Sequence, residues 1–201
     1  MPNVSVAKDT PKTVYFNPIP PFVKLSLNNG EVVELQGSGE LTQAMVTPYK
    51  SSVVSAEIGK SCTRIGEFVF SGCFSLTSVT IPDSVTIIGR SAFTNCKGLT
   101  NITIPDSVIG IGRTAFDSCS GLTSVTIGSG VTYITEHAFS GCSSLTTITS
   151  LATTAPSISS NTFSVKTGGT LRVPIGSTGY DVWMRTYSNY LGYFGWTKVE
   201  Q

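Results

Sequence analysis

The sequence contains a tandem repeat with a 23-residue period. The segment IPDSVTIIGRSAFTNC begins at Ile81, and IPDSVIGIGRTAFDSC begins at Ile104. Aligned without a gap, residues 77–99 and 100–122 are identical at 15 of 23 positions. One unit of this length cannot bury its own apolar side, whereas a stack of units can. The repeat therefore predicts a solenoid in which each coil covers the next.

Apolar residues recur in register through the repeat. Each set of equivalent residues forms a column, and neighbouring coils are expected to lie about 4.8 Å apart where their strands pair. A fully buried Leu, Ile or Phe side chain contributes about 1.5–3 kcal/mol relative to an exposed one, so we expect these columns to be the main source of stability. The columns are Leu76, Leu99, Leu122 and Leu145; Val79, Ile102, Val125 and Ile148; Ile81, Ile104 and Ile127; Val85, Val108 and Val131; Ile88, Ile111 and Ile134; and Phe70, Phe93, Phe116 and Phe139.

Each unit contains a segment with the alternation of a half-buried strand. In LTSVTIP, the apolar Val79 and Ile81 alternate with hydroxyl residues. Pro82 ends the strand because it has no N–H to donate. The later AF..C segment is too short for a regular α-helix, and we expect a 3₁₀ turn or a short second strand there. The repeat thus predicts strands near 78–81, 101–104, 124–127 and 146–149, which form one parallel sheet.

Four of the five cysteines follow the repeat. Cys73, Cys96, Cys119 and Cys142 are spaced at the repeat period, and Cys62 precedes them. This spacing is neither that of a CxxC metal site nor that of an irregular disulfide framework. Parallel side chains in register point the same way, which strains the dihedral angle of a disulfide. We therefore expect reduced thiols that pack as small hydrophobic groups. The Gly, Asn or Ser before each of these four cysteines is suited to a tight turn with positive φ.

The single histidine is interpreted as an exposed turn residue. His137 occupies the column of Ser91 and Thr114, a position that varies within the chain. A catalytic Ser–His or Cys–His pair would require this residue, and so would most zinc sites. Its variable position favours a structural role.

Repeated charged residues also have a structural explanation. Asp83 and Asp106 would lie one coil apart, near the carboxylate spacing of a retaining glycosidase, but the third coil has Ser129 at that position. Turn capping accounts for both aspartates. We interpret the stacked Arg90 and Arg113 as a solvated edge. The sequence therefore predicts no enzyme, no cofactor and no metal site.

Composition narrows the range of partners. Charged residues make up 12% of the chain and the net charge is +1, which disfavours a nucleic-acid binder or a polybasic membrane-surface protein. No stretch approaches about 18 uninterrupted apolar residues, so no transmembrane helix is expected. The start, MPNVSVAKDTPK, lacks the basic segment followed by an apolar stretch that an export signal needs.

The first part of the chain is expected to cap the array. VKLSLNNGEVVEL predicts a hairpin with Asn29-Gly30 at the turn, and Pro18, Pro20 and Pro21 fix an extended approach. Val33 and Leu35 lie one repeat period before Ala56 and Ile58, which predicts one degenerate coil. We therefore divide the chain into an N-terminal β cap with this degenerate repeat at 1–50, the repeat array at 51–150, and a degenerate repeat with a C-terminal cap at 151–201, all within one continuous domain.

The last part of the chain has a stretched repeat and an aromatic end. Phe163 continues the Phe column one residue late. Tyr180, Trp183 and Tyr187 have helical spacing, and Ser177 is placed as an N-cap. We expect a helix here that covers the last open coil with its aromatic side chains.

The pattern L-x-x-[VI]-x-I-P-x-S-V-x-x-I-G-x-x-A-F-x-x-C resembles the leucine-rich repeats of the BspA-like bacterial surface proteins. The resemblance covers about residues 53–150 and continues in degenerate form to the C-terminus, where family members have a similar VP-x-G-S…Y…W unit. It implies a right-handed, curved leucine-rich repeat solenoid, β-rich and with little regular helix outside the C-terminal cap. It also implies an exported protein, extracellular or on the cell surface with its signal removed, that acts as an adhesin or binding module.

The outward side of the predicted strands is the candidate binding surface. Repeat proteins commonly use such an extended face for partners, although short hydroxyl residues also simply form well-solvated strands. A protein or glycan partner, including a host or cell-surface ligand, fits this concave face. The alternative is a structural spacer in a larger surface or phage-tail-like assembly. The candidate residues are Ser55, Glu57, Ser78, Thr80, Asn101, Thr103, Ser124, Thr126, Thr147 and Thr149.

Overall fold

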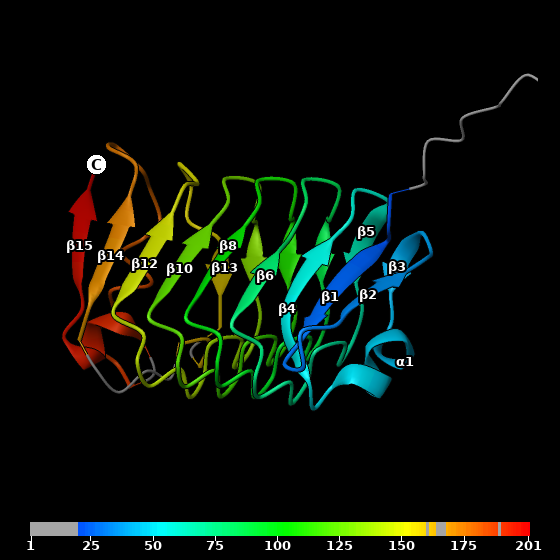
Figure 1. The fold of residues 1–201 in the computed structure, drawn as a ribbon. Helices are drawn as coiled ribbons and strands as arrows, with labels where there is room; N and C mark the ends of the chain where they lie inside the picture. Colours follow the sequence, from blue (N-terminus) through cyan, green and yellow to red (C-terminus); the bar gives the residue numbers. More distant parts are fainter. Residues whose placement is uncertain (1–19, 160, 164–167, 189) are drawn as a thin grey trace, which may run out of the picture.

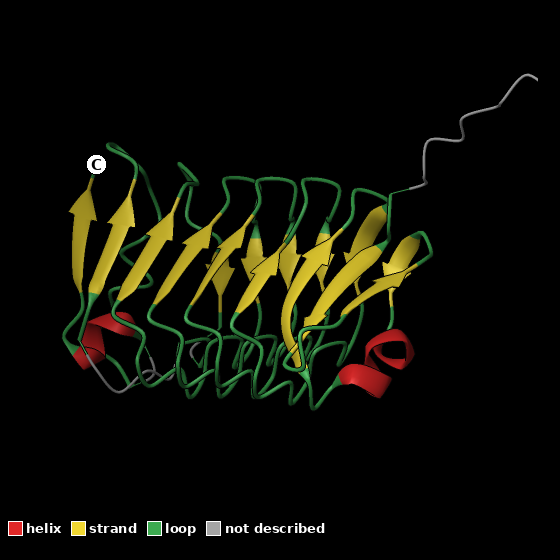
Figure 2. Ribbon diagram, in the orientation of Figure 1, coloured by secondary structure: helices red, strands yellow, loops and turns green. Residues whose placement is uncertain are grey.

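The computed structural model describes residues 20–159, 161–163, 168–188 and 190–201. The chain winds into an elongated stack of coils, with the hairpin of the N-terminal part at one end and the last strand at the other (Figure 1). Strands cover two sides of the stack, and turns join them along a third side (Figure 2). The expected leucine-rich repeat solenoid is confirmed.

The first row of strands comes from the LTSVTIP-type segments. Each coil contributes one strand to this row. The four strand positions predicted from the repeat are confirmed to within one residue. Most neighbours pair in parallel with a shift of one repeat unit, for example Val125 with Ile102 and with Ile148. The strands at 78–80 and 101–104 do not pair, so this row is divided between two sheets, and the prediction that its strands form one sheet is wrong. The strands are β4 (Val53–Ile58), β6 (Ser78–Thr80), β8 (Asn101–Ile104), β10 (Ser124–Ile127), β12 (Thr147–Ser150), β14 (Thr170–Val173) and β15 (Thr197–Glu200).

A second row of strands forms a further parallel sheet of six strands. The sequence had predicted only one sheet. Most of its strands have two residues, so they show no alternation in the sequence. Their inward residue is the Ile of the Ile88, Ile111 and Ile134 column. The AF..C segment that follows is a run of turns rather than the second strand itself. The strands are β3 (Gly39–Leu41), β5 (Cys62–Ile65), β7 (Ile87–Ile88), β9 (Gly110–Ile111), β11 (Tyr133–Ile134) and β13 (Ser157–Ile158).

The N-terminal end carries the hairpin expected at Asn29-Gly30. Its strands β1 (Val23–Leu27) and β2 (Val32–Leu35) are antiparallel, and Gly30 has a φ of 86°. Val33 and Leu35 do not stack on Ala56 and Ile58 as inferred, because β1 lies between β2 and β4 and pairs antiparallel with β4. In the second row, β3 does pair in parallel with β5, about one repeat unit later. The chain then forms α1 (Gln43–Val46) and the 3₁₀ turn η1 (Thr47–Tyr49). Pro18 lies outside the described residues.

A ladder of stacked phenylalanine rings runs through the core. The ring centroids of Phe70, Phe93, Phe116 and Phe139 are 5.1–5.2 Å apart, with interplanar angles of 7° or less. Phe163 continues the ladder, with its ring centroid 5.6 Å from that of Phe139. The sequence predicted this continuation, although Phe163 comes one residue late in the repeat. All five rings are buried, so each interior ring contacts an apolar partner on both faces.

The C-terminal helix expected over the Tyr180, Trp183 and Tyr187 spacing does not form. Residues 180–184 are turns, and a 3₁₀ turn follows at η2 (Leu191–Phe194). Gly179 has a φ of 82°, which is incompatible with the first turn of an α-helix. Ser177 does not act as an N-cap, since its Oγ is buried without a hydrogen-bond partner among the described residues.

The aromatic cover of the last coil is nevertheless present in part. Trp183 packs on Phe163 with ring centroids 5.1 Å apart, and its Nε1 donates to the carbonyl of Pro156 at 3.0 Å. Tyr180 donates from Oη to Ser150 Oγ at 2.6 Å. Tyr187, by contrast, is 70% exposed and does not belong to the cover.

Candidate functional site

The ten predicted binding residues lie together on the outward side of the first row of strands. Strand pairing places them in two parallel lines, which we call the polar strand face. All of them are exposed or half-buried, whereas the apolar residues between them point into the core. The first line holds Ser55, Ser78, Asn101, Ser124 and Thr147, and the second holds Glu57, Thr80, Thr103, Thr126 and Thr149.

The structure extends this face at both ends. Lys24 and Ser26 of β1 pair with Glu57 and Ser55, and Lys24 Nζ lies 3.8 Å from a Glu57 carboxylate oxygen. Thr170 and Arg172 of β14 continue the two lines at the other end. The repeat period could have revealed Thr170 and Arg172, which lie 23 residues after Thr147 and Thr149, whereas Lys24 and Ser26 lie on an antiparallel strand before the repeat. Hydroxyl groups can both donate and accept, so the face suits hydrogen bonding rather than proton transfer.

The polar strand face is divided between β6 and β8. Both strands are fully described, and they are not hydrogen-bonded to each other. A depression of about 420 Å³ lies at this break, with Asn101 and Thr103 on one side and Thr80 on the other. Val79 is half-buried there, although Ile102 and its other column members are buried. The repeat carries no sign of the break, because the units on its two sides are nearly identical in sequence.

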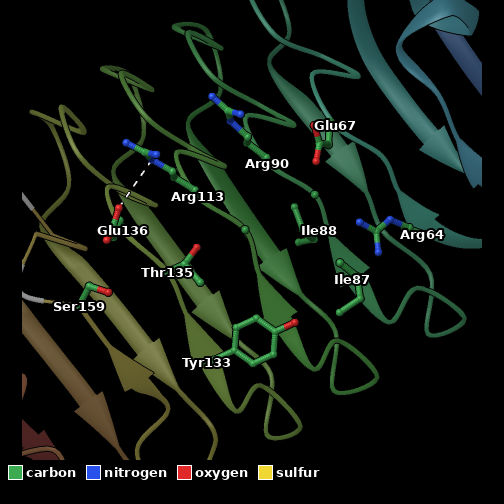
Figure 3. A pocket seen from close by; sticks show the side chains of 12 residues that line it. Arg64, Glu67, Ile87, Ile88, Arg90, Arg113, Tyr133, Thr135, Glu136 and Ser159 are labelled. Atoms are coloured by element: carbon green, nitrogen blue, oxygen red, sulfur yellow. Dashed lines mark ion pairs between the residues drawn. The ribbon is translucent and has the colours of Figure 1, made fainter.

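A groove lies on the second row of strands, away from the predicted site (Figure 3). It has a volume of about 540 Å³. Its central line is set by strand pairing and holds Arg64, Ile87, Gly110 and Tyr133. Arg90 and Arg113, interpreted from the sequence as a solvated edge, stand along its rim, where Arg113 Nε lies 3.7 Å from a Glu136 carboxylate oxygen.

His137 is a turn residue, as the sequence predicts, but it is half-buried rather than exposed. Its φ is 57°, and the equivalent Phe68, Ser91 and Thr114 also have positive φ. The ring Nε2 lies 2.9 Å from Asn161 Nδ2. A second column of positive φ, predicted from the residues before the four cysteines, comprises Gly72, Asn95, Ser118 and Gly141.

Asp106 links neighbouring coils rather than showing the predicted cap of its own turn: its Oδ1 accepts a hydrogen bond from the backbone N–H of Ser129, one coil later, at 2.6 Å. Among the described residues, no group of three or more His, Cys, Asp or Glu side chains is arranged to hold a metal ion.

The five cysteines are buried free thiols. Three of them donate from Sγ to a Phe carbonyl of the preceding coil: Cys96 to Phe70, Cys119 to Phe93 and Cys142 to Phe116, at 3.1–3.2 Å. Burial raises the pKa of Cys73 to about 11 and raises the pKa of Cys62 and Cys142. A hydrogen bond with the Cys119 thiol, together with burial, raises the pKa of Cys96. Neutral thiols are therefore favoured, which is the opposite of an activated nucleophile.

The stacked coils, the two rows of parallel strands and the side-chain ladders together define a leucine-rich repeat solenoid. Residues 48–168 match the family described as "BspA type Leucine rich repeat region", in six copies. The chain belongs to this family. No helix in the described part of the chain is long and apolar enough to cross a membrane.

Two solved structures are similar to the chain. The leucine-rich repeat protein of T. pallidum (TpLRR) is 30% identical, with a TM-score of 0.51, and the match covers 57% of this chain and 53% of that one. A leucine-rich repeat protein from Bacteroides ovatus is 19% identical, with a TM-score of 0.38 and coverage of 80% and 51%. The matches thus span about half the length of each solved protein. No curated protein matches the chain in sequence.

Proposed function

We propose that the protein is a non-catalytic interaction module, secreted or held at the bacterial surface, that binds a protein or a glycan through the polar strand face. The observation that supports this proposal is the alignment of ten exposed or half-buried polar side chains into two lines, which strand pairing sets on β4 and β6 and, beyond the break, on β8, β10 and β12. Solenoid proteins commonly bind partners along such an extended surface. Membership of the BspA-type family supports a surface location.

The chemistry of the face indicates the kind of contact. Its side chains are short and mostly uncharged, and the acidic Glu57 already has Lys24 beside it. Large anchors such as Trp, Tyr and Arg dominate most tight protein interfaces, and within the ten residues there are none. Binding would therefore depend on many weak hydrogen bonds along the strands and would gain strength from several copies displayed together.

A bulky charge in the middle of the face tests the proposal. Thr103→Arg on β8 projects a long cation from an exposed position, and Ser143→Arg makes a comparable change at an exposed turn outside the face. We would measure binding of the folded proteins to immobilised host glycans and extracellular-matrix glycoproteins. Loss of binding in Thr103→Arg, with retention in Ser143→Arg, is expected. Equal binding of both variants, or no binding by the unsubstituted protein, would contradict the proposal.

The structural spacer is the second candidate. It is supported by the regular ladder of Phe rings, which makes an elongated element that needs no partner along its length. A spacer tolerates substitutions on the polar strand face, because its function depends on coil number. Deletion of one repeat unit in the native protein would then impair assembly, whereas Thr103→Arg would not.

A further inference from the structure

The groove on the second row of strands contains a departure from the repeat. The outward position that holds Arg64 in β5 and Ile87 in β7 is a glycine in β9, Gly110, and the next strand supplies Tyr133. A Cβ atom at Gly110 would overlap the end of the Tyr133 ring. The missing side chain therefore provides the space in which the ring lies across the sheet.

Tyr133 forms a platform in this space. Figure 3, which looks onto the groove, shows the ring face-on, with its hydroxyl group directed toward Ile87. The residue remains 38% exposed although one face of the ring lies over Gly110. Because Gly89 and Gly112 also line the groove, the surface beside the ring is low and open. An exposed aromatic face next to a shallow floor can accept a flat, partly apolar ligand.

Charged groups of both signs surround the platform, and two of the arginines are in ion pairs. Arg113 is paired with Glu136 at 3.7 Å, and Arg64 with Glu40 at 3.6 Å. The Arg90 guanidinium lies over the Phe68 ring, with its central carbon 5.6 Å from the ring centroid. Two of the three arginines thus have a glutamate beside them, and Glu67 also lines the groove. The rim offers strong hydrogen-bond donors and acceptors of both signs.

We propose that this groove binds one neutral pyranose ring of a glycan, stacked on Tyr133. The C–H groups on the flat side of a pyranose carry partial positive charge, and the face of an aromatic ring carries partial negative charge. Charged side chains make the stronger hydrogen bonds, so the Arg113–Glu136 pair can donate to one sugar hydroxyl and accept from its neighbour. The volume of about 540 Å³ lies within the usual range for small-ligand sites, ~300–1,000 Å³.

This site is separate from the polar strand face and goes beyond the proposed function. The ion pairs of Arg64 and Arg113 disfavour an acidic peptide or a sulfated or uronic-acid glycan, because such a ligand would need one of these arginines to leave its glutamate. A neutral sugar needs no such exchange. The proposal thus commits to an uncharged glycan, and charged ligands become outcomes of the test.

The test uses defined sugars and the complete chain. Saturation-transfer difference NMR would be recorded with maltose, cellobiose, lactose, mannobiose and diacetylchitobiose, and with digalacturonate as the charged comparison, each at about 10 mM to detect millimolar affinity. We expect at least one neutral disaccharide to bind, with the strongest transfer to the C–H protons of one face of a sugar ring. Absence of binding by all five neutral sugars, or preferential binding of digalacturonate, would overturn the proposal.

Two variants locate the binding without relying on one residue. Tyr133→Ala removes the platform, and Gly110→Ala keeps the tyrosine but displaces its ring. Each should weaken binding by about tenfold, while Tyr187→Ala, at an exposed tyrosine of the C-terminal part, should leave binding unchanged. Unchanged melting temperatures show that both variants are folded. Binding that survives both substitutions would refute the site.

The two proposals can fail independently. Thr103→Arg on the polar strand face should not affect the disaccharide signal, because it lies on the other row of strands. If the sugar signal disappears in Thr103→Arg but persists in Tyr133→Ala, the polar strand face is the glycan site and the groove is not.

Discussion

The phenylalanine column contains core positions at which truncation of the side chain should be strongly destabilising. Phe116 is fully buried and stacks on both faces, at 5.1 Å from Phe93 and 5.2 Å from Phe139. Phe116→Ala should lower the free energy of unfolding by about 3–5 kcal/mol, because it leaves a cavity between two rings. Thr126→Ala, on the outward side of β10, should lower it by less than ~0.5 kcal/mol. Denaturant midpoints of the two variants would measure this, and similar losses would contradict the assignment of inward and outward sides.

The buried thiols predict a loss of stability in alkaline solution. The pKa of Cys73 rises from an ordinary value of 9.0 to about 11 in the folded chain, and the pKa values of Cys62, Cys96 and Cys142 are also raised. Below about pH 9 these thiols are neutral in both states, so their contribution is fully present. Above it, thiols of the unfolded chain ionise while the folded chain still holds protons, so the free energy of unfolding falls until the folded pKa is passed.

Urea midpoints measured between about pH 8 and about pH 11 would test this dependence. The Cys73→Ala variant is the matched control, since it should show a shallower decline over the same range even if it is less stable at every pH. A midpoint that does not change with pH up to about 11 would show that the thiols are accessible in the folded protein.

The columns of stacked side chains could be predicted from the sequence, but contacts between residues that are not one repeat period apart could not. The stacking of Phe93 on Phe116 follows directly from the repeat spacing. The Cys96 thiol instead bonds to the carbonyl of Phe70, 26 residues earlier, and this partner depends on how the turns overlie one another. The Tyr133 platform, by contrast, lies within the repeat period, since Gly110 comes 23 residues before Tyr133; the glycine in this column is the sequence signal that could have revealed it.

At the scale of elements, alternation decided what could be predicted. The first row of strands has three or more residues per coil and alternates between apolar and polar, which is a strong signal. The second row has strands of two residues, such as β7 and β9, which are too short to alternate. The aromatic spacing after Ser177 suggested a helix, but Gly179 at positive φ imposes a turn. Packing between neighbouring coils, rather than the local conformational preference of the sequence, determines the conformation of these segments.

The final strand, β15, ends the apolar ladder with charge. It pairs with β14 so that Lys198 and Glu200 take the places that Leu171 and Val173 hold in the core. Lys198 Nζ lies 3.2 Å from Glu200 Oε1. The backbone N–H of Gly176 and the Lys198 ammonium hold the pKa of Glu200 below its ordinary value. Inward-pointing charges on an edge strand prevent further strands from adding to it.

Replacing these two charged residues with apolar ones should therefore allow copies of the chain to associate through this edge. The double variant Lys198→Val/Glu200→Val continues the apolar lines to an open edge, and we expect dimers or higher oligomers that increase with protein concentration. Thr197→Val, on the same strand, is the control and should behave as the unsubstituted chain does. Light scattering coupled to size-exclusion chromatography would distinguish them. A double variant of unchanged mass would show that another feature protects this edge.

Across the whole molecule, each coil contacts the coils immediately before and after it. In such a solenoid, stability is close to a sum of repeat and interface terms, and the end units determine solubility. The N-terminal end is closed by the antiparallel β1–β2 hairpin against β4. The C-terminal end is closed by Trp183 over Phe163 and by β14 and β15 beside β12. Removing either closure exposes core residues of the next coil.

A chain that ends at Ser150 tests this view of the molecule. It loses β14, which pairs with β12, and the cover over Phe139 and Ile148, so an open strand edge and fresh apolar surface appear together. We expect this shortened chain to aggregate or dimerise, and its melting temperature to fall, although every residue of the most regular repeat units remains. If residues after 150 served only to bind a ligand through their exposed aromatic side chains, such as Tyr187, the shortened chain would remain a stable monomer. Light scattering and thermal unfolding separate the two cases, and an unchanged melting temperature in a monomeric chain would contradict the cap.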